Sequence, residues 1–161
     1  MKADIEIESG GSELLPAVES LWKELCKHHF NLERRFLASA PLDFESRLRI
    51  LKYKGKSHLV ELVRTTGNSN FIGYCVSTID NSLVGEIDSL YIGRNYRRYG
   101  IGKELIKRAL CWMDEHQVST KRVCVLAANK TAIDLYEKFG FTVRQYEMMI
   151  PSEKQQVSPE H

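Results

Sequence analysis

Residues 91–103 read YIGRNYRRYGIGK, and this stretch indicates the fold more clearly than any other part of the chain. An apolar strand ends at Ile92, a loop rich in arginine follows, and Gly100 and Gly102 open a segment with helical spacing. Glycine lets the backbone approach a ligand closely, and the first amides of a helix point out of its end without internal partners. Together with the helix dipole they predict an anion site suited to phosphate, although an exposed basic loop with a tight turn fits the same residues.

Three strands precede this loop. Residues 58–64 (HLVELVR), 71–79 (FIGYCVSTI) and 83–92 (LVGEIDSLYI) are rich in β-branched and aromatic residues and partly alternate apolar with polar ones. Turn-forming clusters separate them at residues 65–70 (TTGNSN) and 80–82 (DNS). Strands joined by such short links predict an antiparallel meander.

Helical spacing dominates on both sides of the meander. Before it, a short strand near residues 5–8 leads into a helix ending near His28, and a second helix begins after Asp43. After it, the predicted elements are a helix from Gly100, a strand at 122–127, a helix at 131–139 and a strand at 141–150. Gly140 suits the left-handed residue that closes a helix. The pattern predicts an α/β fold with a right-handed strand–helix–strand unit.

Composition narrows the class of protein. The chain has 161 residues, 43% of them hydrophobic and 27% charged, with a net charge of +2. These values fit one globular domain, exclude a disordered chain or a rod, and give no reason to expect nucleic acid or a membrane as a partner. No apolar run reaches the roughly 18 residues that span a bilayer, and residues 1–10 do not resemble a signal peptide. We expect a cytoplasmic domain over residues 1–151 and a polar tail over 152–161.

The four cysteines, at positions 26, 75, 111 and 124, form no C-x-x-C pair and lie within apolar patterns. We interpret all four as small, reduced core residues, with Cys124 buried. Cys26, His28 and His29 are metal-ligating residue types, but they lack a fourth ligand at the usual spacing, so no metal site is predicted.

Two motifs resemble one enzyme family. Residues 97–102 (RRYGIG) match [RQ]-x-x-G-x-[GA], and residues 129–141 (NKTAIDLYEKFGF) match N-x-x-A-x-x-L-Y-x-x-x-G-F. The strand at 85–92, which precedes both motifs, fits the same family. In these features the chain resembles the GNAT superfamily of acyl-CoA-dependent N-acetyltransferases. The resemblance is close over residues 57–148 and covers residues 1–54 only in the order of elements. It implies a mixed, mostly antiparallel sheet of about six to seven strands, about four flanking helices and one splayed parallel strand pair.

The resemblance implies that acetyl-CoA is the acyl donor. Its pyrophosphate would lie on the amides of the loop, and its pantetheine arm would pair with the strand end before the loop, where strands splay between Ile92 and Val125. The cofactor-binding residues implied are Leu90, Tyr91, Ile92, Arg97, Arg98, Tyr99, Gly100, Ile101, Gly102 and Lys103. Asn129 belongs to the same set, although Asn is also a favoured helix N-cap.

Three residues are candidates for catalysis. Tyr136 matches the frequent general acid of the family, since a phenol can protonate a thiolate leaving group of comparable basicity. A packing role for Tyr136 fits the same position. Glu86, and after it Asp88, are candidates for the general base, and their spacing puts both on one face of a strand. Either carboxylate could instead bind a cationic substrate or face solvent.

The resulting hypothesis is an N-acetyltransferase that moves an acetyl group directly to a primary amine on a small molecule or peptide. A non-catalytic acyl-CoA-binding sensor is the alternative. A nucleic-acid-binding domain using the loop at 94–103 is disfavoured, because four positive charges without a second basic patch give only weak binding. The sequence identifies neither the acceptor nor an oligomer interface, although homodimers are common in the family.

Overall fold

The computed structural model describes residues 4–34 and 43–151. Within them, five strands form one sheet in the order β1-β2-β3-β4-β5. The elements are β1 (Ile5–Gly10), the 3₁₀ helix η1 (Ser12–Val18), α1 (Glu19–Leu32), α2 (Phe44–Lys54), β2 (Ser57–Thr65), β3 (Phe71–Ile79), β4 (Val84–Ile92), the 3₁₀ helix η2 (Arg94–Tyr96), α3 (Ile101–Glu115), β5 (Thr120–Val123) and α4 (Lys130–Glu137). Strands β1 to β4 are antiparallel and β5 is parallel to β4, so the fold is the predicted mixed α/β domain.

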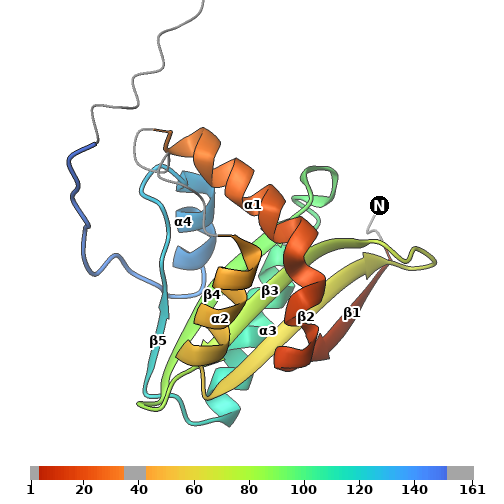
Figure 1. Cartoon of the computed structure of the whole chain (residues 1–161), viewed down its shortest axis with the longest axis horizontal. Helices are drawn as coiled ribbons and strands as arrows, with labels where there is room; N and C mark the ends of the chain where they lie inside the picture. The colour runs from red at the N-terminus through yellow and green to blue at the C-terminus, as the bar shows by residue number, and fades with distance from the viewer. Residues whose placement is uncertain (1–3, 35–42, 152–161) are drawn as a thin grey trace, which may run out of the picture.

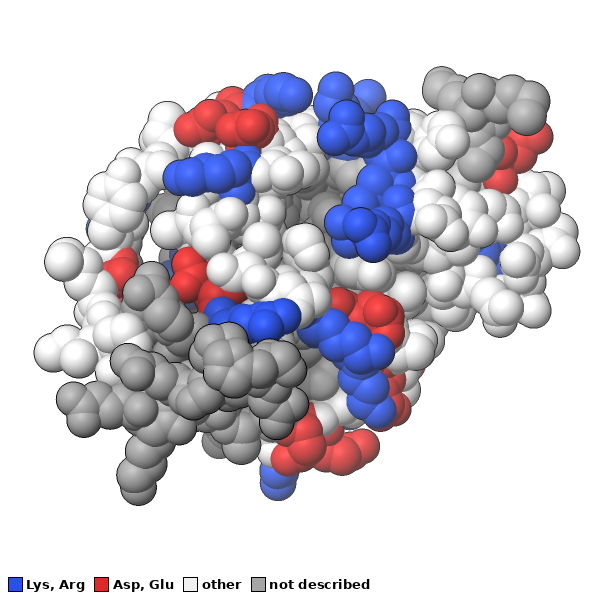
Figure 2. All heavy atoms as spheres, turned by 90° about the horizontal axis from the view of Figure 1, so that it is seen from above, with Lys and Arg blue, Asp and Glu red and all other residues white. Residues whose placement is uncertain are grey.

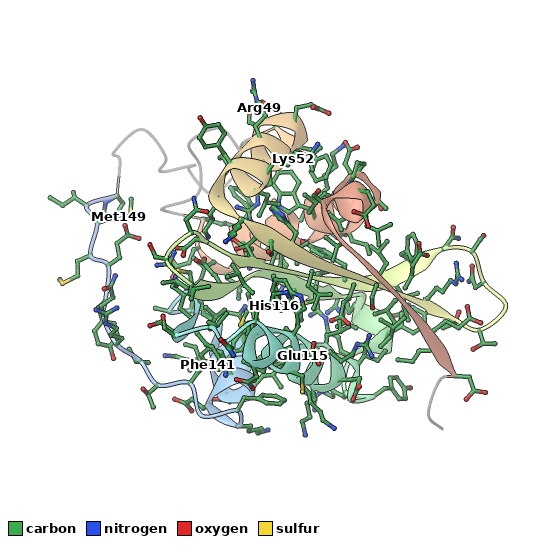
Figure 3. All side chains as sticks on the ribbon, turned by 90° about the horizontal axis from the view of Figure 1, so that it is seen from below. Arg49, Lys52, Glu115, His116, Phe141 and Met149 are labelled. Carbon is green, nitrogen blue, oxygen red and sulfur yellow. The ribbon has the colours of Figure 1, made fainter. Side chains whose placement is uncertain are left out.

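The helices cover the two faces of the sheet (Figure 1). Helices α1 and α2 pack on one face, where Leu15, Leu48 and Tyr74 belong to one buried apolar cluster. Helix α3 packs on the other face with α4, and Leu105 and Tyr136 belong to a second cluster. Figure 3 shows the same three layers from below, with α2 and α3 on opposite sides of the strands. The sheet therefore separates two cores, and each contributes different side chains to the ends of β4.

A β-bulge at Asp88 divides β4. Ser77 of β3 is opposite Ile87, and Val76 is opposite Ser89, so Asp88 has no partner on β3. The extra residue reverses which face the following side chains occupy. Ile87 packs on the α3 side, whereas Tyr91, an even number of residues later, packs on the α1 and α2 side.

The bulge also marks the place where β4 and β5 separate. Their parallel ladder runs from Val84 opposite Thr120 to Ile87 opposite Val123 and ends there. The second half of β4, residues 89–92, is paired with β3 but not with β5. The end of the ladder agrees with the splayed parallel pair that the resemblance implies, but pairing already stops at Ile87 and Val123, before the expected Ile92 and Val125.

Two predictions near the C-terminus are wrong. The predicted strand at 122–127 is shorter and ends at Val123, and residues 141–150 form neither helix nor strand, which leaves five strands instead of six to seven. The composition of residues 141–150 suits a strand, but a strand needs a paired neighbour, and no described residue supplies one. The predicted polar tail at 152–161 lies outside the described residues.

The cysteines are not all core residues as predicted. Cys75 is buried and Cys26 is partly buried, but Cys111 and Cys124 are exposed, and none of the four is in a disulfide. Cys111 lies on the outer side of α3. Cys124 follows the end of β5, the last strand of the sheet, and no strand among the described residues covers it.

Candidate active site

Gly100 begins helix α3 in a conformation that favours glycine. Its φ is +85°, in the left-handed region, and it is the N-cap residue of α3. Its carbonyl accepts from the Glu104 amide at 3.0 Å, so the helix starts immediately after it. A Cβ atom placed on Gly100 would meet nothing within 4 Å, which shows open space in front of the first turn. The first amides of a 15-residue helix therefore face an open approach, as an anion site requires.

Gly102 is the point where three elements meet. A Cβ atom placed on it would lie 3.6 Å from Leu135 Cδ2 of α4 and 3.9 Å from Leu90 Cδ2 of β4. These are ordinary van der Waals distances, so alanine also fits, in agreement with the [GA] position of the motif. The start of α3, the open end of β4 and the middle of α4 are thereby held together.

Arg97 fastens the loop to the end of β4. Its Nε donates to the Ile92 carbonyl at 2.9 Å, and its guanidinium lies 5.5 Å from the centre of the Tyr91 ring. Arg98, Tyr99 and Lys103 are exposed around the same turn. Figure 2 shows the molecule from above, with a group of Lys and Arg atoms that has no Asp or Glu atoms within it. None of the ion pairs among the described residues involves Arg97, Arg98 or Lys103. The positive charge of the loop is therefore not locally neutralised.

Residues 90–92 form sheet hydrogen bonds on one side of the strand only. Gly73 is opposite Ile92 and Cys75 is opposite Leu90 on the β3 side, while the β5 side has no ladder beyond Ile87. An amide-bearing ligand along that side can supply the missing hydrogen bonds. The structure thus brings the predicted residues 90–92 and 97–103 to one place.

Asn129 caps α4. Its Oδ1 accepts from the Ala132 amide at 3.2 Å. Of the two roles considered for this residue, the structure shows the helix cap.

Tyr136 is buried on the α3 side of the sheet, with 8% of its surface exposed. Its ring packs edge-on against Phe141, with ring centres 5.6 Å apart. Burial, and to a lesser extent the neighbouring Cys75, raise the pKa of Tyr136 above its usual value. Its hydroxyl therefore keeps its proton throughout the physiological pH range, although it is a weaker acid than a free phenol.

Glu86 and Asp88 lie on the opposite face of the sheet, toward α2. Lys54 of α2 lies between them, with its Nζ 2.8 Å from Glu86 Oε2 and 2.7 Å from Asp88 Oδ1. Arg122 Nε of β5 donates to the same Glu86 oxygen at 2.6 Å, and Thr78 Oγ1 donates to Asp88 Oδ2 at 2.5 Å. The expectation that both carboxylates share a face is confirmed, since one ammonium reaches both.

The pKa of Lys54 shows what this cluster does to an amine. Burial lowers it most, but the hydrogen bonds that the ammonium donates to Asp88 and Glu86, together with the attraction of the two negative charges, outweigh burial, and the pKa of Lys54 is raised above its usual value. The two carboxylates therefore stabilise an ammonium ion at this position. Sequence reasoning missed Lys54, Arg122 and Thr78. Only Arg122 left a signal, because in-register pairing of the two parallel strands puts it opposite Glu86.

Comparison with known proteins places the chain in a family. The model of the acetyltransferase (GNAT) family matches residues 18–141. The chain belongs to this family. No curated protein matches it significantly.

Several solved structures share the GNAT fold of this chain. One is a tetramutant of the BH1408 protein from Bacillus halodurans, with a TM-score of 0.70 and 18% identity over 91% of this chain and 99% of that one. Another is the aminoglycoside acetyltransferase meta-AAC0020 from an uncultured soil metagenomic sample, in complex with sisomicin (TM-score 0.64, 18% identity, 92% and 95% coverage). A third is AAC(6')-Iy with the bisubstrate analogue CoA-S-monomethyl-acetylneamine (TM-score 0.60, 14% identity, 92% and 98% coverage). At these identities the likeness concerns the fold.

The described residues contain neither a cluster suited to a metal ion nor a membrane-spanning helix. Across residues 4–34 and 43–151, no group of three or more His, Cys, Asp or Glu is arranged to hold a metal ion. No helix in the same residues is long and apolar enough to cross a membrane.

Proposed function

We propose that this GNAT protein transfers an acetyl group from acetyl-CoA directly to the nitrogen of a primary amine. The observation that carries the proposal is the open helix start at Gly100, which lies beside the unpaired side of β4. Phosphates suit the first amides of α3 and the exposed Arg98 and Lys103. The pantetheine arm contains amides, which suit the side of residues 90–92 that faces away from β3, where no ladder with β5 continues and the Ile92 carbonyl accepts from Arg97. The two features adjoin at Gly102, as binding of one long ligand requires.

The proposed catalytic groups lie on opposite faces of the sheet. Glu86 and Asp88 are on the α2 side, and Tyr136 is on the α3 and α4 side. Beyond Ile87 and Val123 no ladder between β4 and β5 separates the two faces. A thioester held along residues 90–92 could therefore be approached by an amine from one face and receive a proton from the other.

The proposed step balances in protons and bonds. The amine nitrogen forms a bond to the thioester carbonyl carbon, and the carbon–sulfur bond breaks. Glu86 takes the proton that the amine loses, with Asp88 as the second candidate, and the Tyr136 hydroxyl gives a proton to the departing sulfur. Both side chains return to their starting state by exchange with water.

Lys54 supports a cationic acceptor. A substrate ammonium can replace the Lys54 Nζ at Glu86 Oε2, 2.8 Å away in this structure, while Lys54 stays paired with Asp88 at 2.7 Å. The same stabilisation opposes the loss of a proton from the substrate ammonium. We therefore propose that Lys54 keeps one carboxylate paired while Glu86 receives that proton. Among the structural neighbours, two were solved with aminoglycosides or their analogues, which carry several amines. A polyamine, an amino sugar or a peptide amine fits this chemistry.

The chain's cysteines support a reducing compartment such as the cytoplasm. All four are outside disulfides, and Cys111 and Cys124 are exposed to solvent. Exposed thiols of this kind persist where the surroundings are reducing.

A turnover assay tests the proposed function. Release of CoA from acetyl-CoA is measured with a thiol reagent, in the presence of spermidine, an aminoglycoside or a lysine-containing peptide. The control is a neutral sugar that has hydroxyl groups but no amine. We expect amine-dependent release with the cationic acceptors and none with the sugar. Tight binding of acetyl-CoA with no turnover for any amine would contradict the proposal and favour a binding domain without catalysis.

A further inference from the structure

Arg47 of α2 is a partly buried cation that has no carboxylate beside it. None of the ion pairs among the described residues includes Arg47. Its Nη2 donates to the backbone oxygen of Asp88 over 3.4 Å, and its Nε is buried without a hydrogen-bond partner in the same part of the chain. A buried donor without a partner costs free energy, so the guanidinium is suited to an acceptor group that a ligand brings.

A second unpaired donor lies near Arg47. Tyr74 belongs to the buried cluster under α1 and α2, and its hydroxyl has no hydrogen-bond partner within the described ranges. Burial raises the pKa of Tyr74 above its usual value, and nearby Ser89 and the positive charge of Arg47 lower it only in part. The hydroxyl therefore stays protonated as a donor close to the guanidinium. Two unpaired donors on the α2 side of the sheet favour a ligand with a negatively charged oxygen.

This pair of donors adjoins the charged cluster on β4. Arg47 and Lys54 lie about two turns apart on α2, so both face the same strand. Arg47 contacts the backbone oxygen of Asp88, and Lys54 contacts the carboxylate of the same residue at 2.7 Å. Asp88 lies at the bulge, where the ladder between β4 and β5 has ended. An amine at Glu86 and an anionic group at Arg47 would therefore be separated by only a few bonds of the same small molecule.

A carboxylate suits Arg47 better than a phosphate does. A guanidinium presents parallel N–H donors that match the two oxygens of a carboxylate. Phosphate offers a similar match, but it carries more negative charge, and the neighbouring carboxylates of Glu86 and Asp88 repel it more strongly. Arg47 itself is partly exposed, so a ligand can reach the guanidinium from solvent.

We propose that the acceptor is a zwitterion, an amino acid or a close relative that carries a carboxylate as well as the amine to be acetylated. Arg47 binds the carboxylate, with the Tyr74 hydroxyl as a second donor, and the amine meets Glu86. Arg47 and Tyr74 are then residues that determine specificity. The inference rests on the proposed function for its chemistry, and it narrows the cationic acceptors to those with a carboxylate near the amine.

Binding of matched amines is the first test, measured by calorimetry with and without CoA so that no turnover is needed. The pairs are lysine and cadaverine, ornithine and putrescine, and phenylalanine and phenethylamine, which differ only in the carboxylate. At least one amino acid should bind about 10- to 100-fold more tightly than its partner, as a hydrogen-bonded charge provides. General attraction to Glu86 and Asp88 would favour the partner instead, because it has the higher positive charge. Absence of a carboxylate preference in all three pairs would overturn the proposal.

Variants assign the preference to Arg47. Arg47→Met should remove it by weakening the amino acid alone, with binding of the partner amine within about twofold of wild type. Arg49→Met is the matched control, because Arg49 is also on α2 but points away from the sheet and donates to Ser46 (Figure 3). Arg47→Lys keeps the charge without the paired donors and should retain part of the preference. A preference that persists in folded Arg47→Met would overturn the proposal.

Tyr74→Phe tests the second donor without opening a cavity. Since the hydroxyl has no partner in the described residues, its removal should leave Tm unchanged or slightly higher. Affinity for the preferred amino acid should fall about 3- to 10-fold, and affinity for its partner amine should stay the same. An equal loss for both compounds would show that Tyr74 only packs, and would overturn its assigned role.

Turnover separates this inference from the proposed function. With acetyl-CoA the same carboxylate preference should appear in kcat/KM, mainly through KM. Binding of an amino acid through Arg47 without release of CoA would support the zwitterion site and contradict the proposed function. Amine-dependent turnover that is equal for both members of every pair would support the proposed function and overturn the zwitterion site.

Discussion

The two halves of β4 are similar in length but have opposite surroundings. Residues 85–87 are paired on both sides, with β3 and with β5, whereas residues 89–92 are paired with β3 only. The paired half holds Glu86 in a network of fixed charges, and the open half lies next to the helix start at Gly100. The difference teaches that one strand can provide both rigid positioning and a vacant backbone edge, because a bulge and the loss of one neighbour coincide at Asp88.

This contrast makes separable predictions. Changes in the paired half should impair the acceptor step and leave acetyl-CoA binding intact. Changes at the open half should do the reverse.

Glu86→Gln should reduce kcat about 100- to 1,000-fold, as loss of a general base does, while the Kd for acetyl-CoA stays within about twofold. Steady-state kinetics and calorimetry measure the two quantities. Glu61→Gln is the matched control, since Glu61 is also a buried carboxylate paired with an arginine, Arg108, but lies on β2. Equal activity of the Glu86 variant and the control would show that Glu86 is structural.

Lys54→Met should destabilise the fold by about 2–3 kcal/mol, because it removes a cation from Asp88, whose side chain is 1% exposed. The loss is smaller than for a fully buried pair, because the Lys54 side chain is 30% exposed. Thermal unfolding should show a Tm lower by roughly 4–12 °C. Lys23→Met, which breaks an exposed pair with Glu19, should leave Tm nearly unchanged. Equal Tm values for the two variants would contradict the account of the cluster.

Tyr136→Phe should reduce kcat about 10- to 100-fold with little change in acetyl-CoA affinity. Because burial raises the pKa of Tyr136, its acid form persists above the usual phenol range. The wild-type pH profile of kcat should therefore show no loss from this group below about pH 10. If the Phe variant keeps full kcat, Tyr136 has only a packing role.

Glu61→Gln should have a small, pH-dependent effect on stability. Burial raises the pKa of Glu61 above its usual value despite Arg108, so the folded state holds this proton more tightly than the unfolded state does. The protonated Glu61 carboxyl contributes its full stability to the wild type below the pKa of the unfolded state. This contribution is lost as the pH rises through the higher pKa of the folded state. The Tm of the variant minus that of the wild type should increase from pH 4 to pH 7.5. A constant difference would contradict the sign.

Much of the fold could be predicted from the sequence, for local physical reasons. The strand at 71–79 has the predicted ends and that at 57–65 differs by one residue at each end, because alternation and turn residues are local signals. The start of α3 could be predicted at Gly100, because the left-handed backbone conformation at that position favours glycine. The sequence did not show which strands pair with one another. Nothing near residues 141–150 shows that no described strand pairs with them, and nothing near Cys124 shows that β5 is an edge.

The candidate site was predictable in its backbone more than in its charges. The motif around Gly100 and the splay after Ile87 follow from one stretch of chain and its strand–helix–strand context. The pairing of Glu86 with Lys54 joins residues 32 positions apart on different elements, and no periodicity encodes it. The roles of Glu86 and Tyr136 remain predictions, which the kinetic variants test.

The most direct test of the account is acetyl-CoA binding to wild type, Gly100→Asp and Gly67→Asp, measured by calorimetry. Both glycines have positive φ, +85° and +80°, and open space around a Cβ, so the two variants carry the same backbone strain and the same added charge. Gly67 lies in the turn between β2 and β3, away from the helix start. The account predicts micromolar binding by wild type and Gly67→Asp and at least about 100-fold weaker binding by folded Gly100→Asp, equivalent to about 2.8 kcal/mol. Equal binding by all three would contradict the central claim that the start of α3 holds the phosphates of the donor.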